Sequence, residues 1–364
     1  MGKLVTRLIA FLAGAIAVLV MLELLLRLIP VRDGAYAADP SRKWPAHTMI
    51  ADTNYTYSLG WNANNIHHGH INNLGYVSPF DYHEGASGIV VIGDSYVESM
   101  MNDYNDTLQG MLARNLRSAQ QVMNFGMSGA DLAHYLGTAQ LVGQHFSPSW
   151  AVFVITAGDY SGGFSADPGY FRWAPKRNPP VELVPEIERP PLTKFLRSLA
   201  LTRYVRGNLM MQMGDVIHLH RAHDSDGGCP YRELSRKDER LTSKFIGALP
   251  RALGVPPGHV ILVFDSDRKA MYDSTPAAAT ECPNVDQLAR NRLMLLAAIS
   301  GMRVIDSGPI FHEYYASTHQ RLDFLPQDGH WNPTAHRLMA HAVAEVINED
   351  EHVAPGTTML SLAQ

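Results

Sequence analysis

The sequence predicts an α/β fold in which helices cover both faces of a parallel sheet. Residues 88–93, 150–156 and 259–264 are short, continuous apolar runs, as expected of parallel strands that are buried on both faces. Segments with helical spacing alternate with these runs, and the connections between them are short. Such alternation is typical of a doubly wound sheet.

The alternating part of the chain is predicted to form one domain at residues 87–350. The expected strands are residues 88–93, 121–125, 150–156, 259–264 and 302–307. The expected helices are residues 107–118, 130–144, 192–213, 239–253, 285–300 and about 333–347. Proline-rich stretches interrupt the alternation at about 160–230, so we interpret that part as an insertion rather than a separate domain. Residues 351–364 are expected to be a tail.

The first 30 residues predict a membrane-spanning helix. Lys3 and Arg7 precede an uncharged run at residues 8–22, and apolar residues continue beyond Glu23 to Ile29. A helix of this length can cross a bilayer of about 30 Å. The basic residues ahead of it place the N-terminus in the cytoplasm and the remaining chain outside.

The segment around this helix leaves a second interpretation open. Glu23 and Arg27 are four residues apart and can pair on a helix, which lowers the cost of burying either one. The alternative is a cleaved signal peptide, since residues 35–37 resemble a small-x-small cleavage site. Either way we expect an extracytoplasmic domain, periplasmic or extracellular. Residues 31–86, rich in Pro, Asn, His and Tyr, are expected to form a linker and an irregular lead-in.

The overall composition excludes some classes of function. The chain has 364 residues, of which 46% are hydrophobic and 18% charged, as is typical of a globular protein. A net charge of −5 argues against a nucleic-acid partner. Cys229 and Cys282 are too few for a disulfide scaffold or a four-ligand zinc site; outside the cytoplasm they can form one disulfide, and otherwise they stay thiols. The oligomeric state stays open.

Ser95 is the leading candidate for a nucleophile. It lies in the segment VIGDSYVES, where the first predicted strand ends and the chain turns into a helix. Such a turn exposes a side chain at the carboxyl edge of a parallel sheet, where the sites of α/β proteins form. Free N–H groups at the helix N-terminus can stabilise an oxyanion beside the hydroxyl. The alternative is that Asp94 and Ser95 only cap the helix.

Asp328 and His330 are the candidates for an orienting carboxylate and a general base. They lie in the segment LPQDGHWNP, just before the last predicted helix. A serine nucleophile needs a base, and the base needs a carboxylate that orients it. A turn here would let Asp328 contact one imidazole nitrogen of His330 while the other faces Ser95. The alternative is a surface loop that ends at the helix start Asn332-Pro333.

Three motifs together resemble the SGNH/GDSL hydrolase superfamily. They are GDS at 93–95, NFGMSG at 124–129 and DGHWN at 328–332, in the order in which the family has them. The resemblance covers about residues 88–348 and implies a flavodoxin-like three-layer α/β/α sandwich with a parallel sheet. It also implies a Ser-His-Asp triad without a cofactor.

The resemblance assigns roles to individual residues. It makes Ser95 the nucleophile, His330 the base and Asp328 the orienting carboxylate. The backbone N–H groups of Ser95 and Gly129 would donate to the oxyanion, and Gly158 stands at the position of the third donor.

The chain departs from the family pattern in two places. The family has its Asp three residues before the His, whereas Asp328 is two residues before His330. Some membrane-anchored members of the family and some polysaccharide acetyltransferase relatives look similar to this shorter form. The family's third oxyanion donor is an Asn side chain, and the segment here reads TAGDYS. With Gly158 in that position the side-chain donor is absent, and with Asp159 there a carboxylate would face the oxyanion. Losing one donor costs about 10²–10³ in rate.

Several polar and aromatic residues near these motifs are candidates for the substrate pocket. They are Asp94, Asp159, Tyr160, Asp265 and Trp331. Two of them have other interpretations: Asp265 could cap a loop, and Trp331 could anchor the last helix.

A histidine-rich segment, HHGH, contains His67, His68 and His70. It could bind a metal, but its histidines are by default exposed ones, because no carboxylate or cysteine lies close to them in the sequence. We therefore assign no metal site.

These observations predict an ester hydrolase that acts through an acyl-Ser95 intermediate. By resemblance to exported, anchored relatives, the expected substrate is an O-acyl group of a cell-envelope carbohydrate. One alternative is an O-acetyltransferase of exported polysaccharide. The other is a non-catalytic polysaccharide-binding protein with a decayed site.

Overall fold

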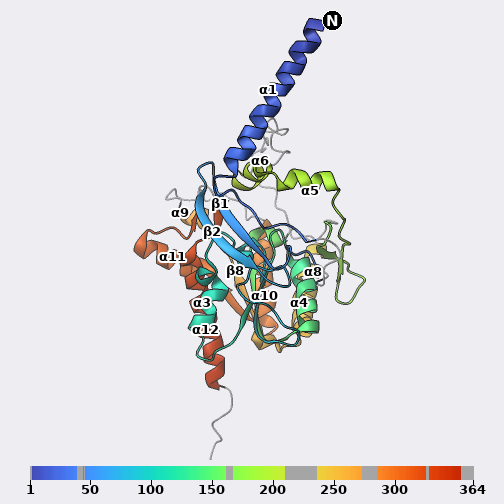
Figure 1. Ribbon diagram of the computed structural model, residues 1–364. Coiled ribbons are helices and arrows are strands. Elements are labelled where there is room, and N and C mark those ends of the chain that lie inside the picture. The colour runs from blue at the N-terminus through green and yellow to red at the C-terminus, as the bar shows by residue number, and fades with distance from the viewer. Residues whose placement is uncertain are drawn as a thin grey trace, which may run out of the picture.

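The structure is a computed structural model that describes residues 2–38, 44, 46–160, 167–209, 236–272, 285–324 and 328–353. Its centre is a parallel sheet of five strands (Figure 1). In spatial order they are β4 (Val122–Gly126), β3 (Ser87–Gly93), β5 (Ser147–Ile155), β8 (Val260–Phe264) and β9 (Arg303–Asp306). The strand order changes direction at β3, which comes first along the chain and has β4 and β5 on its two sides. This topology confirms the predicted doubly wound α/β fold.

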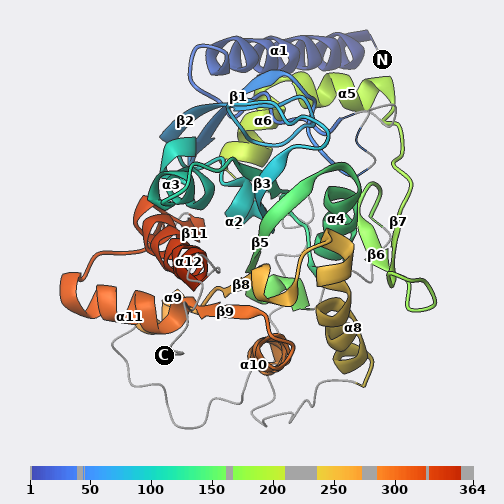
Figure 2. The same ribbon diagram turned by 90° about the horizontal axis from the view of Figure 1, so that it is seen from below.

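Helices cover both faces of the sheet and make three layers (Figure 2). Successive side chains of β3 alternate between two cores: Val90 and Ile92 pack into one, Ile89 and Val91 into the other. The first core includes α4 (Leu132–His145), α8 (Arg236–Leu253) and α10 (Val285–Ile299). The second includes α3 (Leu108–Asn115), α11 (Ser307–Thr318) and α12 (Pro333–Val353). Because both faces are covered, β3 and β8 are continuous apolar runs, which is the pattern that predicted them.

Short elements connect these layers. They are α2 (Ser95–Glu98), η1 (Tyr104–Asp106), η2 (Ala157–Tyr160), η4 (Pro257–His259), α9 (Arg268–Tyr272), β10 (Asp323–Phe324) and β11 (Asp328–Trp331). The last two strands pair as an antiparallel hairpin.

The segment before the sheet contains an antiparallel hairpin, so the expectation of an irregular lead-in is wrong there. Its strands are β1 (Thr53–Leu59) and β2 (Asn64–Ile71). Tyr55, Tyr57 and Ile71 pack into the same core as α4. Most residues of the two strands are polar and their burial does not alternate strictly, which hides the strand period in the sequence.

The insertion contains a small hairpin, β6 (Phe171–Trp173) and β7 (Val181–Leu183), followed by short helices. The single helix expected at 192–213 is wrong: α5 (Pro191–Ser198), α6 (Ala200–Arg203) and the π-helical turn η3 (Tyr204–Asn208) replace it as far as the structure describes it. The break lies at Leu199, whose backbone is extended. A new helix can start there because the Glu23 carboxylate accepts hydrogen bonds from the N–H groups of Ala200 (3.0 Å) and Leu201 (2.9 Å).

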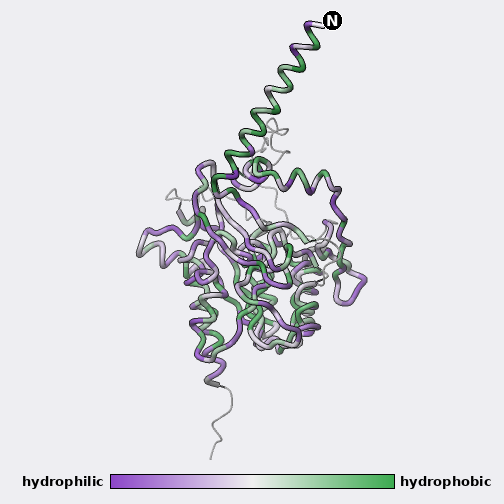
Figure 3. The backbone as a smooth tube through the Cα atoms, in the orientation of Figure 1, coloured by the Kyte–Doolittle hydropathy of each residue, from purple (hydrophilic) through white to green (hydrophobic). Residues whose placement is uncertain are grey.

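The N-terminal helix α1 (Gly2–Leu26) projects away from the sheet (Figure 1). It is hydrophobic along most of its length (Figure 3), and none of its side chains is buried in the fold. By length and composition it can cross a membrane or act as a signal sequence. The expected pair forms near its end, with Arg27 Nη2 at 2.8 Å from Glu23 Oε1.

Candidate active site

Ser95 lies at the carboxyl edge of the central sheet. Strand β3 ends at Gly93, Asp94 caps α2 by accepting a hydrogen bond from Tyr96 N (2.9 Å), and Ser95 is the first residue of this helix. The short helix can cross the strand ends because Gly126 has no side chain: a Cβ there would lie 2.2 Å from Glu98 N. The Ser95 side chain is only partly buried, so its hydroxyl is available at this edge.

His330 reaches Ser95 and Asp328 at once. Its Nε2 lies 2.7 Å from Ser95 Oγ. Its Nδ1 lies within hydrogen-bond distance of Asp328 Oδ1, which also accepts from His330 N at 3.0 Å. The structure thus brings together the three residues that the motifs single out, although Ser95 and His330 are 235 positions apart in the chain.

The spacing of Asp328 and His330 is explained by their backbone. Both belong to β11, which pairs with β10, and not to the turn that the sequence suggested. In a strand, residues two apart place their side chains on the same side. The carboxylate therefore lies beside the imidazole without the extra residue that the family has between them.

Asp328 is stabilised as a carboxylate although it is 5% exposed. Burial raises the pKa of Asp328, but the hydrogen bonds and charge of His330, together with Tyr57, outweigh burial and hold the pKa below its usual value. The Tyr57 hydroxyl, on β1, donates to Asp328 Oδ2 at 2.9 Å. Burial and the negative charge of Asp328 raise the pKa of Tyr57, so this hydroxyl stays protonated and remains a donor.

Two backbone N–H groups at this edge of the sheet are candidates for oxyanion donors. Ser95 is at the first position of α2, so its N–H has no partner within the helix. Gly129 ends a turn after β4 with φ +79°, a conformation that favours glycine, and its N–H has no hydrogen-bond partner among the described residues. Gly158 lies in η2 at the end of β5 and is exposed. These three positions follow the ends of adjacent strands.

Asp94 and Asp159 are buried, and their carboxylates bond to groups inside the fold, which contradicts their expected place in the substrate pocket. Asp159 Oδ2 accepts from Thr156 N (2.7 Å) and Tyr135 Oη (3.0 Å), and Asp94 Oδ2 accepts from Thr156 Oγ1 (3.2 Å). Burial raises the pKa of Asp94 to about 6. Burial and the neighbouring Asp94 raise the pKa of Asp159 well above its usual value. Tyr160 is partly buried against the core beside them.

Asp265 and Trp331 belong to a buried network next to His330, and because Trp331 is fully buried the expectation that it lines the substrate pocket is wrong. Trp331 is fully buried, and its Nε1 donates to Asp265 Oδ1 at 2.8 Å. Asp265 also pairs with Arg268, whose other nitrogen donates to the Gly329 carbonyl and to Tyr96 Oη (3.0 Å). This buried network fixes the backbone directly before His330. The alternative role of Trp331, an anchor beneath the last helix, agrees with its packing.

A cavity of about 400 Å³ lies beside this edge of the sheet. Its lining includes Ser128, which precedes Gly129, and Glu98, whose carboxylate accepts from Ser128 N (2.7 Å) and Ser128 Oγ (2.8 Å). Tyr170 also lines it and donates to the Ser128 carbonyl at 2.7 Å. No sequence motif predicted this cavity, because its walls come from the lead-in, the insertion and the turn after β4.

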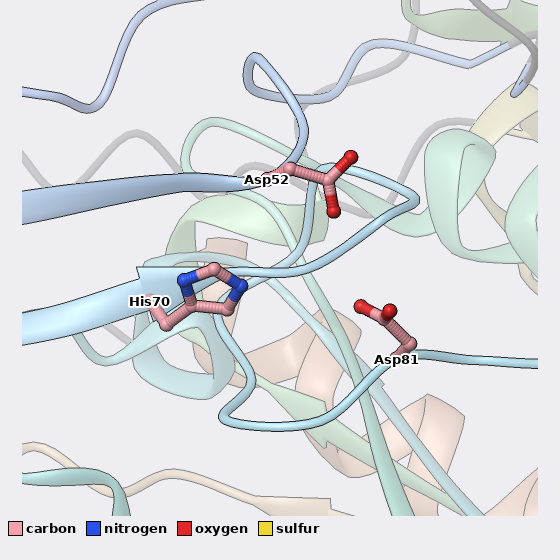
Figure 4. A group of neighbouring side chains, drawn as sticks. All are labelled: Asp52, His70 and Asp81. Atoms are coloured by element: carbon pink, nitrogen blue, oxygen red, sulfur yellow. The ribbon is translucent and has the colours of Figure 1, made fainter.

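The histidines of the HHGH segment lie on β2 and make separate contacts. His67 Nδ1 is 2.8 Å from Asp103 Oδ1, and His68 Nδ1 is 3.1 Å from Thr56 Oγ1. His70 instead lies near two carboxylates that are distant in the sequence, Asp52 and Asp81, with one potential ligand atom of each within 4.8 Å of the others (Figure 4). Both aspartates are exposed, so this group by itself assigns no metal. Cys229 and Cys282 lie outside the described residues.

Comparisons with known proteins find similarity only among solved structures. No family model and no curated protein matches the chain. A member of the lipolytic G-D-S-L family from Veillonella parvula is 13% identical with a TM-score of 0.35, over 72% of this chain and 98% of that one. Est24, a carbohydrate acetylesterase from Sinorhizobium meliloti, is 11% identical with a TM-score of 0.35, over 72% and 99%. The lipase/acylhydrolase from Enterococcus faecalis is 12% identical with a TM-score of 0.39, over 73% and 96%.

The Veillonella parvula protein is named as a member of the G-D-S-L family, which the three motifs resemble. At such identities and TM-scores the likeness does not decide what this chain does, so the functional argument has to come from the side-chain geometry at Ser95.

Proposed function

We propose that the protein is a serine-dependent esterase in which Ser95, His330 and Asp328 form a catalytic triad. The observation that carries the proposal is the pair of contacts made by His330. One nitrogen is 2.7 Å from Ser95 Oγ and the other bonds to the buried Asp328 carboxylate. A base that an ionised carboxylate orients against a hydroxyl is the arrangement that activates a serine nucleophile.

The proposed reaction has two halves. Ser95 Oγ attacks the ester carbonyl carbon while His330 Nε2 takes the hydroxyl proton, and the negative charge moves to the carbonyl oxygen. The N–H groups of Ser95 and Gly129 stabilise that oxyanion, and Gly158 is our candidate for a third backbone donor. Collapse expels the alcohol, which takes the proton from His330. Water then attacks the acyl-Ser95, His330 takes a proton from it, and the acid leaves as the proton returns to Ser95.

We further propose an exported domain that α1 anchors in the membrane, and an O-acyl group of a cell-envelope carbohydrate as the substrate. The substrate class follows from the resemblance to anchored relatives. An O-acetyltransferase would use the same acyl-Ser95 and differ only in the acceptor. The binding-only alternative rests on the missing Asn side chain at Gly158, and the intact contacts of His330 with Ser95 and Asp328 favour catalysis over it.

A fluorophosphonate probe tests the esterase directly. We expect the wild-type chain to be labelled and the Ser95→Ala variant to stay unlabelled, because only an activated serine reacts with the probe. Ser128→Ala is a matched control, since it removes a hydroxyl from the wall of the neighbouring cavity and should keep the label. No label on folded wild-type protein would reject the esterase and leave the binding-only function.

A burst assay then distinguishes hydrolase from transferase. Hydrolysis of an aryl acetate should show a fast first turnover as acyl-Ser95 accumulates. If an added oligosaccharide becomes acylated, the enzyme is a transferase; if acetate is the only acyl product at every acceptor concentration, it is a hydrolase.

A further inference from the structure

The insertion helix α5 has an apolar stripe that the described part of the chain does not cover. Leu192, Phe195 and Leu196 are at helical positions i, i+3 and i+4, and they are 67%, 60% and 46% exposed. No residue of α5 is buried. A surface helix of a globular protein normally turns such a stripe onto the core, so this one is suited to an apolar surface outside the protein.

The position of α5 relative to α1 indicates which surface this is. Helix α5 leads through Leu199 directly into α6, and the first N–H groups of α6 bond to Glu23 of α1. Figure 1 shows α5 and α6 at the base of α1, with α5 pointing sideways from it. The apolar stripe therefore lies at the level at which α1 would enter a bilayer.

Basic side chains accompany the stripe. Arg197 lies on α5, with Arg189 before it and Arg206 on η3, and none of the three makes an ion pair with any residue that the structure describes. Burial lowers the pKa of Arg197, and the positive charges of Arg189 and Arg206 lower it further. Cations that repel one another beside an apolar stripe are suited to the phosphate groups of lipids.

An exposed tryptophan lies next to η3, which follows α5 and α6 in the chain. Trp61 is at the turn of the β1–β2 hairpin and is 76% exposed. Its carbonyl accepts from the hydroxyl of Tyr204 at 2.7 Å, and Gly60 N donates to the Asn208 carbonyl at 2.9 Å, so the turn is held against η3. Exposed tryptophans are enriched where proteins meet the headgroup region of a bilayer.

We propose that α5 and Trp61 lie in the headgroup region of the phospholipid bilayer that α1 crosses, and that Arg189, Arg197 and Arg206 bind lipid phosphates there. The proposal rests on the anchoring by α1 and is independent of the ester chemistry. A helix that lies in the membrane surface has this composition, with Leu and Phe on one side and basic residues on the other.

The orientation places the candidate active site on the membrane side of the domain. Helix α12 begins just after Trp331 and runs away from α1, so the edge of the sheet that carries His330 faces the anchor (Figure 1). The cavity beside that edge is lined by Arg197 and Arg206 as well as by Ser128.

Photo-crosslinking of the full-length chain tests the proposal. The chain carries p-benzoylphenylalanine in place of Phe195 and is reconstituted in vesicles of phosphatidylethanolamine and phosphatidylglycerol. The matched control carries the probe at Ile299, which is also exposed and ends α10 at the amino edge of the sheet. Mass spectrometry after irradiation should find lipid adducts at position 195 at about tenfold the yield at 299, since partial burial of one such side chain changes a partition ratio by roughly that factor.

A second experiment tests whether the three arginine charges are needed. Replacing Arg189, Arg197 and Arg206 by Gln should lower the adduct yield in anionic vesicles to the level that the unchanged chain gives in phosphatidylcholine vesicles. An equal yield at 195 and 299 in a chain that floats with the vesicles would refute the proposal, as would crosslinking of position 195 to a second copy of the chain. A chain that does not float would refute both the anchor and this proposal. Fluorophosphonate labelling of the same samples reports on Ser95 separately.

Discussion

Removing the hydroxyl of Tyr57, on the β1–β2 hairpin, should weaken the orientation of His330 through their shared partner Asp328. Asp328 Oδ1 accepts from His330, whereas Oδ2 has the Tyr57 hydroxyl as its donor. The change Tyr57→Phe keeps the buried ring and removes only that donor. It leaves one oxygen of a 5% exposed carboxylate without a partner in the described structure.

The size of the effect follows from the charge on the acceptor. A hydrogen bond to a charged group contributes about 1.5–3 kcal/mol, and a buried acceptor that loses its partner incurs most of that cost. We therefore expect the free energy of unfolding to fall by roughly 2 kcal/mol at pH 7. A carboxylate that can turn away from His330 should also lower kcat by about tenfold, which corresponds to ~1.4 kcal/mol of barrier.

The stability that the Asp328 carboxylate contributes depends on pH in a predictable direction. The pKa of Asp328 is lowered in the folded state, so its contribution to stability is present above the unfolded value of about 3.9 and is lost as the pH falls through the folded pKa. The stability difference between wild type and Tyr57→Phe should therefore be largest at neutral pH and should shrink in acid.

Denaturant unfolding at pH 7 and pH 3, together with aryl acetate kinetics at pH 7, measures these effects. Tyr55→Phe is the matched control: Tyr55 is two positions away on the same strand, it is buried as well, and its hydroxyl does not contact Asp328. The reasoning is refuted if Tyr57→Phe retains wild-type stability and kcat at pH 7. Equal losses in the two variants would also refute it.

Two further substitutions test the carboxylates on either side of the site. Asp328→Asn should lower kcat by about 10⁴ while the chain stays folded, because the amide favours the wrong imidazole tautomer, and a loss below tenfold in aryl acetate kinetics would contradict the triad. Asp159→Asn should gain stability relative to wild type as the pH rises from 4 to 7, because burial and the neighbouring Asp94 raise the pKa of Asp159 in the fold, so the unfolded chain releases this proton more readily. Urea unfolding at the two pH values measures that gain, and a pH-independent difference would mean that Asp159 is ionised in the fold.

The sheet and the three residues around His330 were predictable because each left a local signal. Strands buried on both faces are apolar runs, and a serine at a strand end before a helix marks one edge of the sheet. The sequence could not show that Asp328 and His330 share a strand. Strand β11 is only four residues long, DGHW, which is too short to show the alternation of polar and apolar residues that marks a strand. The spacing of two residues between Asp328 and His330 is explained only by the strand backbone that the structure shows.

The residues that hold the site were not predictable, since their contacts join distant parts of the chain. Tyr57 and Asp328 are 271 positions apart, and Arg268 reaches Gly329 from the start of α9. Trp331 has a polar neighbour on each side in the sequence, so nothing local indicates that it is fully buried. The break at Leu199 depends likewise on Glu23, a residue of another helix.

The chain just after α1 is part of the fold, and this bears on whether α1 is removed. Asp33 N donates to the Thr56 carbonyl (2.9 Å) and Thr56 N to the Asp33 carbonyl (3.0 Å), which ties this segment to β1. The guanidinium of Arg32 lies 4.8 Å from the ring centre of Tyr57. Cleavage after residue 37 would remove Arg32 and Asp33, and with them the support of the tyrosine that bonds to Asp328. A chain that keeps α1 therefore keeps these contacts of Tyr57, and this argues for our proposal that α1 is retained rather than cleaved.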